Sequence, residues 1–344
     1  MISCTYEQEQ EKGTQLRNVL RINEASFYNT LYPPAAKDIA SIHIIGQIYE
    51  GLVKYNPEDL SVEPAIAEKW EVSPDGKIYT FHLRDNVFFH DDSCFTDGKG
   101  RQVTASDFKY TYELLCTKDE YNTSFYGILD KVVGAKDFYN DDSLKSDIDG
   151  IRVIDDFTLQ IELTEEHPLL LYFLANPQAV VLPHEAINMY GKNSYIGCGP
   201  FYLDKKNKSK DKLRLIKFPK YYKTDNDGNK MPYLDTVLVT FVSSLQREIH
   251  MFENDELDVI IGIPGEKITE FMDKHVKEFE SNPPVYVLNQ SNEDIESNVY
   301  NIFRSYVKGL YTNRMNFLDL SRVYYEMPKE IEKEKLKEEL LTNN

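Results

Sequence analysis

The sequence has few cysteines and no long apolar run, and each shortage excludes a class of protein. Only four of its 344 residues are cysteine, and no two of them have the CxxC spacing of zinc or dithiol sites. The most apolar stretch, residues 169–182, is interrupted by Asn176, Pro177 and Gln178. It is also shorter than the ~20 residues that a membrane-spanning helix needs. We therefore expect no metal site, no redox centre and no membrane span.

Positive charge is also scarce. The chain carries 39 Lys and Arg against 57 Asp and Glu, a formal net charge of −18. Nucleic acids and anionic membranes are bound through cationic footprints, so we expect neither as a partner. The length suits two lobes rather than one and is ample for a sizeable core.

Catalytic motifs are missing as well. The sequence contains no GxSxG, GxxxxGK[ST], HExxH or GxGxxG pattern. Acidic pairs at 141–142, 155–156 and 165–166 fit solvated turns better than the fixed separation of glycosidase carboxylates. His90, before two aspartates, lacks the second histidine of a metal site. We expect no catalytic residue, no metal and no cofactor; a hydrolase with an acidic cleft is a minor alternative that substrate turnover would reveal.

What is present is an alternation of strand and helix patterns, which predicts a mixed α/β fold. Asp38 and Thr104 stand where helices can be capped, and residues 73–76 (SPDG) form a typical hairpin turn. Strands are expected at residues 15–22, 70–72, 77–84, 151–154, 158–163, 201–203, 213–218, 236–242 and 257–261, and helices at 39–50, 104–116, from 168, and at 244–254.

Nine segments, in this order, resemble the bacterial extracellular solute-binding proteins of family 5, the peptide receptors of ABC importers. The blocks are GQIYEGL (46–52), EPAIAEKWEVSPDGK (63–77), YTFHLR (79–84), FHD (89–91), VTASDFKY (103–110), GPFYL (199–203), MPYLD (231–235), ELDV (256–259) and VKGLYTNRMNFLDLSRVYY (307–325). The run from Trp70 to Arg84 is the most specific of them.

This resemblance implies a venus-flytrap fold of the periplasmic-binding-protein type II kind, with a truncated second lobe. The expected division is a flexible leader at 1–14, a discontinuous first lobe at 15–50, 166–262 and 300–327, an inserted small subdomain at 51–165, a remnant of the second lobe at 263–299, and a charged tail at 328–344. We expect the remnant to cross back to the first lobe without a core of its own.

The resemblance also implies a function. The chain would be the substrate-binding component that captures a peptide or similar small solute and delivers it to ABC permease and ATPase subunits, in the periplasm or cell envelope. Extended peptides bind through main-chain hydrogen bonds with a few polar anchors. The first-lobe positions that match the family's ligand contacts are Glu24, Ala25, Ser26, Tyr49, Glu50, Gly197, Cys198 and Gly199. The family's second-lobe acid, which holds the α-amino end of a peptide, has no assignable counterpart.

Cys4 follows small and apolar residues and precedes a polar stretch, as in a mature lipid-anchored protein. The basic and apolar signal regions that would precede such a cysteine are not part of the sequence. A lipid anchor at Cys4 is expected, with a free cysteine near the start as the alternative. The alternative function is a ligand-incompetent truncated paralogue or adaptor that keeps the scaffold without binding peptide.

Overall fold

The computed structural model describes residues 19–261, with gaps at 57–58, 120–121, 123–124, 127, 141–146, 208, 210 and 226–227, together with residues 285–287. Several predictions lie outside these residues. They concern the leader and Cys4, the second-lobe remnant apart from 285–287, the segment 300–327, and the charged tail.

The described secondary structure alternates strands with short helices. The strands are β1 (Val19–Glu24), β2 (Val53–Tyr55), β3 (Val62–Pro64), β4 (Ala67–Val72), β5 (Ile78–Leu83), β6 (Ile151–Asp155), β7 (Thr158–Glu162), β8 (Phe201–Leu203), β9 (Lys212–Lys217), β10 (Thr236–Phe241), β11 (Val259–Ile261) and β12 (Val285–Val287). The α-helices are α1 (Ile39–Ile48), α2 (Ala105–Leu115), α3 (Ala135–Asn140), α4 (Leu170–Leu174), α5 (His184–Tyr190) and α6 (Leu245–Glu253).

One sheet has the strand order β1-β10-β9-β8, and β1 runs parallel to β10. Leu20 and Ile22 of β1 stand opposite Val237 and Val239 of β10. These four side chains are buried in one apolar cluster that includes Ile45 of α1. The apolar face of the sheet, made of every second strand residue, thus packs against the apolar face of α1 in one core.

The other four-stranded sheet is antiparallel, with the order β4-β5-β7-β6. The β4–β5 hairpin turns through Gly76, which adopts a φ of +69° that glycine tolerates without strain. Helix α2 contacts β6 and β7, and it begins at a capping box in which Thr104 and Asp107 each accept a backbone N–H of the first turn.

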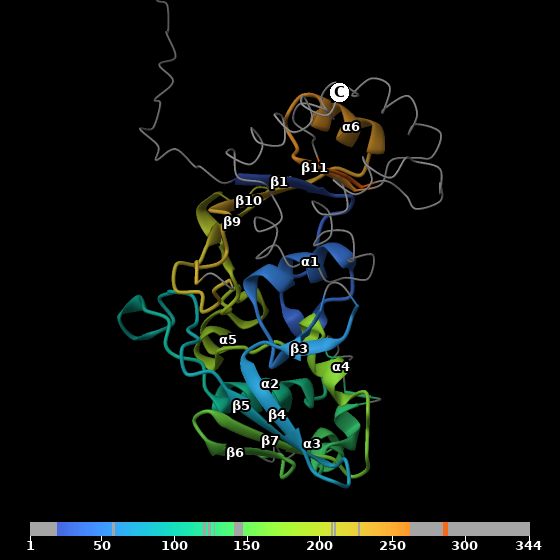
Figure 1. Ribbon diagram of the computed structural model, residues 1–344, viewed down its shortest axis with the longest axis vertical. Coiled ribbons are helices and arrows are strands. Elements are labelled where there is room, and N and C mark those ends of the chain that lie inside the picture. Colours follow the sequence, from blue (N-terminus) through green and yellow to red (C-terminus); the bar gives the residue numbers. More distant parts are fainter. Residues whose placement is uncertain are drawn as a thin grey trace, which may run out of the picture.

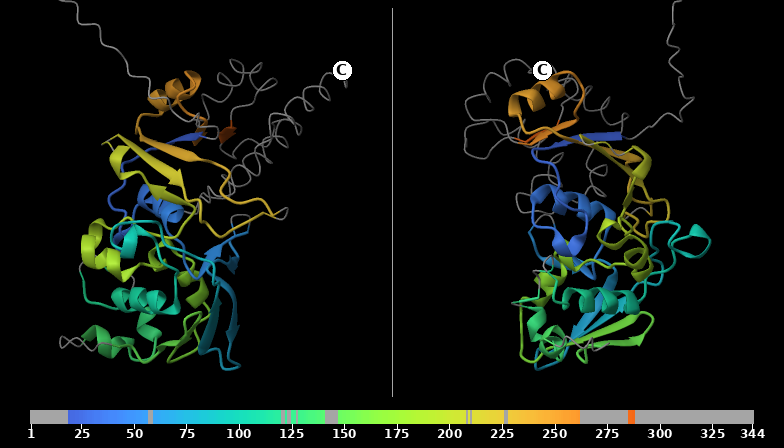
Figure 2. Two further views of the ribbon diagram at one scale, coloured as in Figure 1. Left: turned by 90° about the vertical axis from the view of Figure 1, so that its left-hand side faces the viewer. Right: turned by 180° about the vertical axis from the view of Figure 1, so that it is seen from behind.

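The buried apolar residues form two clusters. The first cluster contains Leu20, Ile45, Phe201 and Val237 with their neighbours, and the second cluster is built around the antiparallel sheet and α2. Figures 1 and 2 show the two sheets at opposite ends of the long axis, with α1 between them. The division into a first lobe and an inserted subdomain remains a prediction.

The two segments of chain that connect the clusters are hydrogen-bonded to each other through their backbones. The chain leaves the first cluster after Tyr49 and returns to it at Val180. Next to these two residues, the Val181 N–H donates to the Glu50 carbonyl oxygen at 3.0 Å. Gly51 lies so close to this crossing that an added Cβ would stand 3.2 Å from the carbonyl oxygen of Leu174. The two connecting segments, around residues 50–51 and 174–181, are therefore in direct contact.

Most predicted elements are confirmed, within one to three residues at their ends, while residues 15–18 of the first predicted strand lie outside the described part of the chain. Two differ for a physical reason. Strand β1 continues to Glu24 because its partner β10 extends alongside it to Phe241. Helix α1 ends at Ile48, three residues before Gly51, because Gly51 serves the close backbone crossing and not a helix cap.

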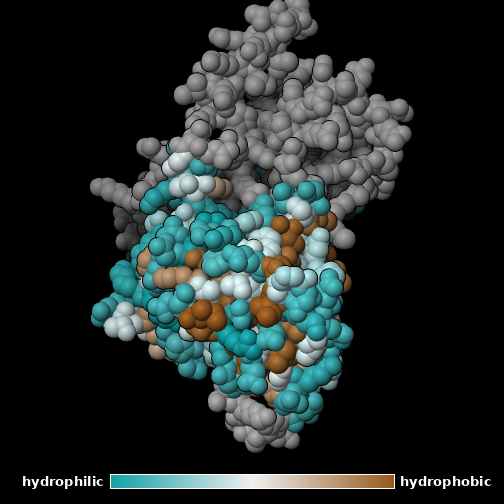
Figure 3. All heavy atoms as spheres, turned by 60° about the horizontal axis from the view of Figure 1, so that its bottom comes forward, coloured by the Kyte–Doolittle hydropathy of each residue, from teal (hydrophilic) through white to brown (hydrophobic). Residues whose placement is uncertain are grey.

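The described surface is largely polar. Figure 3 shows one face on which apolar groups interrupt a mostly hydrophilic cover. The large apolar side chains that are exposed are Phe27, Ile39, Val72, Tyr126, Ile154, Leu169, Tyr172 and Met189. In the part of the chain that the structure describes, no helix has the length and apolarity needed to cross a bilayer.

Candidate ligand-binding site

Glu24 ends β1, at the carboxyl end of the parallel pair β1–β10, the edge where ligands of open α/β sheets bind. Its carboxylate accepts a hydrogen bond from His43 Nδ1 of α1 at 2.8 Å, and both side chains are almost buried. Ala25 and Ser26 follow on an exposed loop. The structure therefore fixes the carboxylate against α1 and leaves the next two residues accessible.

Glu50 is the centre of a second polar group. Its Oε1 accepts hydrogen bonds from Lys223 Nζ at 3.0 Å, Tyr222 OH at 3.0 Å and Tyr221 OH at 3.3 Å. The Glu50 side chain is 8% exposed. Burial, together with the neighbouring carboxylate of Glu50, raises the pKa of Tyr222 well above its usual value, so this phenol stays a neutral donor.

The second oxygen of Glu50 is different. Oε2 is buried and has no hydrogen-bond partner among the described residues. Buried carboxylate oxygens normally have partners, because an unsatisfied one costs free energy. Glu50 therefore has one saturated oxygen and one with remaining acceptor capacity.

Tyr49, beside Glu50, is buried and donates its hydroxyl to the carbonyl oxygen of Ser194 at 2.9 Å. Burial raises the pKa of this phenol far above its usual value. Tyr49 thus stays neutral and anchors the end of α1 to the chain after α5.

The loop of Gly197, Cys198 and Gly199 packs against the last turn of α1. Gly199 N–H donates to the Ile48 carbonyl oxygen at 2.9 Å, and a Cβ at Gly197 would overlap that same oxygen. The close approach that these glycines permit is therefore to the backbone of α1. Cys198 is 1% exposed, and burial raises the pKa of its thiol well above the usual value.

His90 holds this loop from the other side. Its N–H donates to the Gly197 carbonyl oxygen at 2.8 Å, and its Nε2 donates to the Gly199 carbonyl oxygen at 2.9 Å. Burial lowers the His90 pKa to about 4, so the ring is neutral at pH 7. Both ring nitrogens of this histidine, which suggested a metal site in the sequence, thus have backbone partners, the Gly199 carbonyl at Nε2 and the Gly197 N–H at Nδ1.

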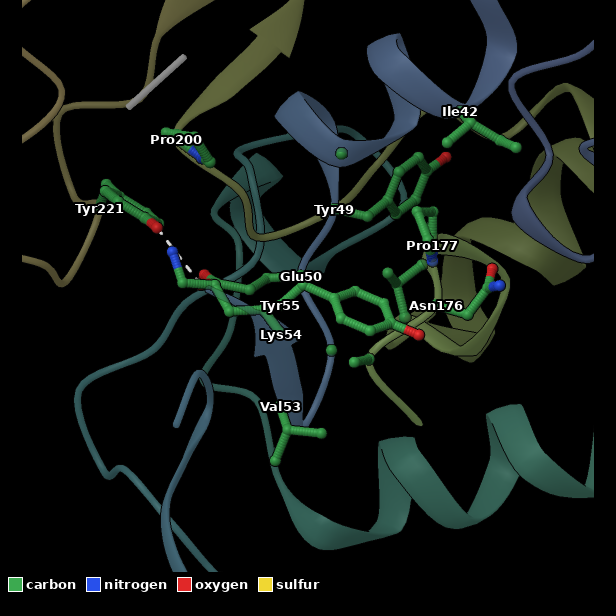
Figure 4. Close-up of a pocket in the computed structure, with 14 residues that line it drawn as sticks. Ile42, Tyr49, Glu50, Val53, Lys54, Tyr55, Asn176, Pro177, Pro200 and Tyr221 are labelled. Atoms are coloured by element: carbon green, nitrogen blue, oxygen red, sulfur yellow. Dashed lines mark hydrogen bonds between the residues drawn. The ribbon is translucent and has the colours of Figure 1, made fainter. Parts of the chain in front are cut away.

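A cavity of about 90 Å³ lies beside Glu50. Figure 4 shows residues that surround it, and the lining consists of Ile42, Gly46, Tyr49, Glu50, Gly51, Val53, Lys54, Tyr55, Ala175, Asn176, Pro177, Val180, Pro200 and Tyr221. Pockets for small organic ligands usually measure roughly 300–1,000 Å³. The described residues therefore form one wall with a hollow, not a complete enclosure.

Of the predicted site residues, the structure brings Tyr49 and Glu50 together in the lining of this cavity. Glu24, Ala25 and Ser26 lie at the end of β1 and are not among the lining residues, and neither are Gly197, Cys198 and Gly199. Helix α1 joins the two places, since His43 contacts Glu24 while Ile42 and Gly46 line the cavity.

The sequence interpretation missed the partners of these residues. Lys223 and its two tyrosine neighbours are 171–173 positions from Glu50, and no local pattern connects segments so far apart. His43 of α1, the partner of Glu24, was not among the predicted site residues either. Among the described residues, no group of three or more His, Cys, Asp or Glu could hold a metal ion.

Comparison with solved structures defines the class of protein. The periplasmic oligopeptide-binding protein OppAIV of Borrelia burgdorferi superposes with a TM-score of 0.63 at 26% identity, over 74% of this chain and 49% of that one. The fold is that of the OppA-like periplasmic binding proteins.

The family follows from the sequence comparison. The model of the bacterial extracellular solute-binding proteins, family 5, matches residues 61–303. The chain belongs to this family. Its members are transport binders and not enzymes.

Two curated proteins from Bacillus subtilis are similar to this chain in sequence. The dipeptide-binding protein DppE is 29% identical over 76% of this chain and 46% of its own length, and the oligopeptide-binding protein OppA is 28% identical over 73% and 44%. The chain thus spans about half the length of the curated relatives it matches.

Proposed function

We propose that this chain is the substrate-binding component of a peptide-type ABC importer, which captures a peptide or similar solute and delivers it to a membrane permease. The observation that carries the proposal is the family match over residues 61–303. The relatives named above are a dipeptide-binding and an oligopeptide-binding protein, which favours peptides as the solute class.

The residues proposed to contact the ligand are those matched to the family's first lobe. Ala25 and Ser26 are exposed beside a strand end and supply main-chain groups to an extended peptide. Glu50 has an acceptor oxygen without a partner among the described residues, next to the cavity, where a donor of the ligand would satisfy it. Tyr49 lines the same cavity, and Glu24 and the loop 197–199 are proposed as further contacts at the strand end and at the end of α1.

The proposal places the protein in the periplasm or cell envelope, as the extracellular description of the family suggests. Cys4 is proposed as the site of a lipid anchor. Intact-mass measurement of the protein purified from its native membrane fraction tests the anchor, since diacylglyceryl addition raises the mass and a free cysteine leaves it unchanged.

The test of function is a thermal-shift and calorimetric screen of the purified chain against di- to pentapeptides. A ligand at 100 times its Kd stabilises the folded state by about 2.7 kcal/mol, which shifts the melting temperature by several degrees. We expect such a shift with a subset of peptides. A flat response with a cooperative melt would contradict the proposal.

One observation favours a second candidate, a scaffold that binds no peptide. The cavity of about 90 Å³ is too small to enclose a dipeptide, so the described wall alone gives little desolvation to a ligand. For this candidate, titration calorimetry would give no heat with any peptide.

A further inference from the structure

Phe27 is a large apolar residue next to the predicted contact residues in the sequence, and it is 45% exposed. It stands directly after Ser26, on the loop that leaves β1. Its ring stacks on that of Tyr28 with centroids 4.4 Å apart and planes at 24°, and it meets Phe241 of β10 at 4.7 Å and 60°. The three rings form an aromatic platform, which we define as Phe27, Tyr28 and Phe241.

The base of the aromatic platform is held in place. Tyr28 is 7% exposed, and Phe241 is followed by Val242, whose N–H and carbonyl are both bound by the Asn23 side chain at 2.8 and 2.9 Å. The loop itself is tied to α1, because the N–H groups of Asn29 and Thr30 approach Ser41 Oγ at 3.1 and 3.2 Å. An exposed ring on a fixed base loses little conformational entropy when a ligand covers it.

The charges near the aromatic platform bear on which ligand groups it can bind. Glu24, the acid nearest in sequence, is buried and paired with His43, so it does not add a free counter-charge for a cationic group. What remains accessible is an apolar ring face. Aromatic rings prefer such a face in offset or edge-on arrangements.

We infer that Phe27 is a specificity-determining residue and forms the floor of a subsite for an aromatic side chain of the bound peptide. This inference rests on the proposed peptide-binding function. In an extended peptide held along residues 24–26, every second side chain faces the same way, roughly 6.6 Å apart along the axis, and the inference assigns the Phe27 ring to the side chain that faces the loop after Ser26.

The experiment is titration calorimetry of the full chain with four tripeptides, Ala-Phe-Ala, Ala-Leu-Ala, Ala-Arg-Ala and Ala-Ala-Ala. The variants are Phe27→Ala, which removes the side chain, and Phe27→Leu, which keeps an apolar group without a ring. Tyr126→Ala is the matched control, because Tyr126 is also aromatic and is 72% exposed on a different loop. Thermal melts establish that each variant is folded.

We expect the unmodified chain to bind Ala-Phe-Ala about three- to tenfold more tightly than Ala-Leu-Ala, the range of a ring–ring contact. Phe27→Ala and Phe27→Leu should abolish this preference while the affinity for Ala-Ala-Ala changes less than twofold. Tyr126→Ala should behave as the unmodified chain.

Three results would overturn the inference, in distinguishable ways. Binding of all four peptides with equal affinity removes the subsite and leaves the proposed function intact. A Phe27-dependent preference for Ala-Arg-Ala shows a cation–π site in place of an aromatic one. Absence of binding to every peptide overturns the proposed function, and the subsite with it.

Discussion

At the residue scale, Glu50 shows how one side chain serves structure and site together. Its Oε1 gathers one ammonium and two phenol groups from the segment after β9, while the residue itself lines the cavity. Lys223 is only 16% exposed, and its Nζ lies 3.0 Å from this carboxylate. A buried pair of this kind is costly to break, because removal of one partner leaves the other charge uncompensated.

Replacement of the carboxylate therefore has a predictable cost. We expect Glu50→Ala to lower the free energy of unfolding by about 3 kcal/mol, measured by urea denaturation at pH 7. The matched control is Glu63→Ala, which breaks a more exposed pair with Lys54 and should cost under about 1 kcal/mol. Equal costs for the two variants would show that the Glu50 cluster does not anchor the fold.

His90 predicts a pH dependence. Its pKa falls from 6.5 to about 4 in the folded chain because the ring is fully buried. Between these two pH values the unfolded chain binds a proton that the folded chain does not, so stability falls as the pH falls through this window and levels off below about 4. The loss from this one residue amounts to about 3 kcal/mol.

Unfolding measured from pH 7 to pH 4 in the unmodified chain and in His90→Phe checks this dependence. The variant should be less stable at pH 7, because the Gly199 carbonyl loses its donor Nε2 and the Gly197 N–H loses its acceptor Nδ1, but its slope against pH should be smaller by one proton in the window. Identical slopes would mean that His90 titrates normally.

At the element scale, much of the fold was predictable because its signals are local. Asp38 caps α1 by accepting from Ser41 N–H at 2.9 Å, and the turn at Gly76 sets the β4–β5 hairpin. Pairings between distant segments were not predictable. The parallel alignment of β1 with β10 joins residues 217 apart (236 − 19), and the partners of Glu50 are similarly remote. The sequence specifies such contacts only through the whole packed chain, so Tyr49 and Glu50 were predicted as site residues without their neighbours.

The end of α1 gives a prediction about glycine. A Cβ at Gly197 would overlap the Ile48 carbonyl oxygen and lie 2.8 Å from Tyr49 Cδ1. Backbone groups cannot move away cheaply, so we expect Gly197→Ala to lower the melting temperature, with a loss of about 2 kcal/mol or more.

The matched control lies on the helix itself. Gly46 of α1 has nothing within 4 Å of an added Cβ, and alanine is the better helix former by roughly 1 kcal/mol. Gly46→Ala should therefore leave stability unchanged or raise it. If both alanine variants were equally stable, the loop 197–199 would not need its close approach to α1.

At the scale of the whole molecule, two neighbouring acids link the parts of the chain that carry the two apolar clusters. Asp91 binds Lys220 at 2.8 Å and Lys99 at 3.1 Å. Asp92 binds Lys205 at 2.9 Å and the Tyr190 hydroxyl at 2.6 Å. The contacts with Lys220 and Lys205 reach from the loop after β5 to the segments that flank β9.

Removal of this link should weaken the molecule in a salt-dependent way. We expect the double variant Asp91→Asn with Asp92→Asn to lose about 1–2 kcal/mol of unfolding free energy at low ionic strength, since exposed ion pairs contribute up to about 1 kcal/mol each, and less at 1 M salt. The control removes the same net charge through Glu68→Gln with Asp137→Asn, both exposed. A loss of equal size in the control would assign the effect to net charge alone.

The hydrogen bond from Val181 N–H to the Glu50 carbonyl oxygen brings together the two ends of the intervening segment of 130 residues (181 − 50 − 1). The entropy of closing a loop grows only with the logarithm of its length, about 0.6 kcal/mol for each doubling. The hydrogen bond that joins the two ends involves only backbone atoms, so it does not depend on the side chains at positions 50 and 181. Insertions or deletions inside this segment therefore change the entropy of its closure little, provided that the contacts of His90, Asp91 and Asp92 with the rest of the chain are kept.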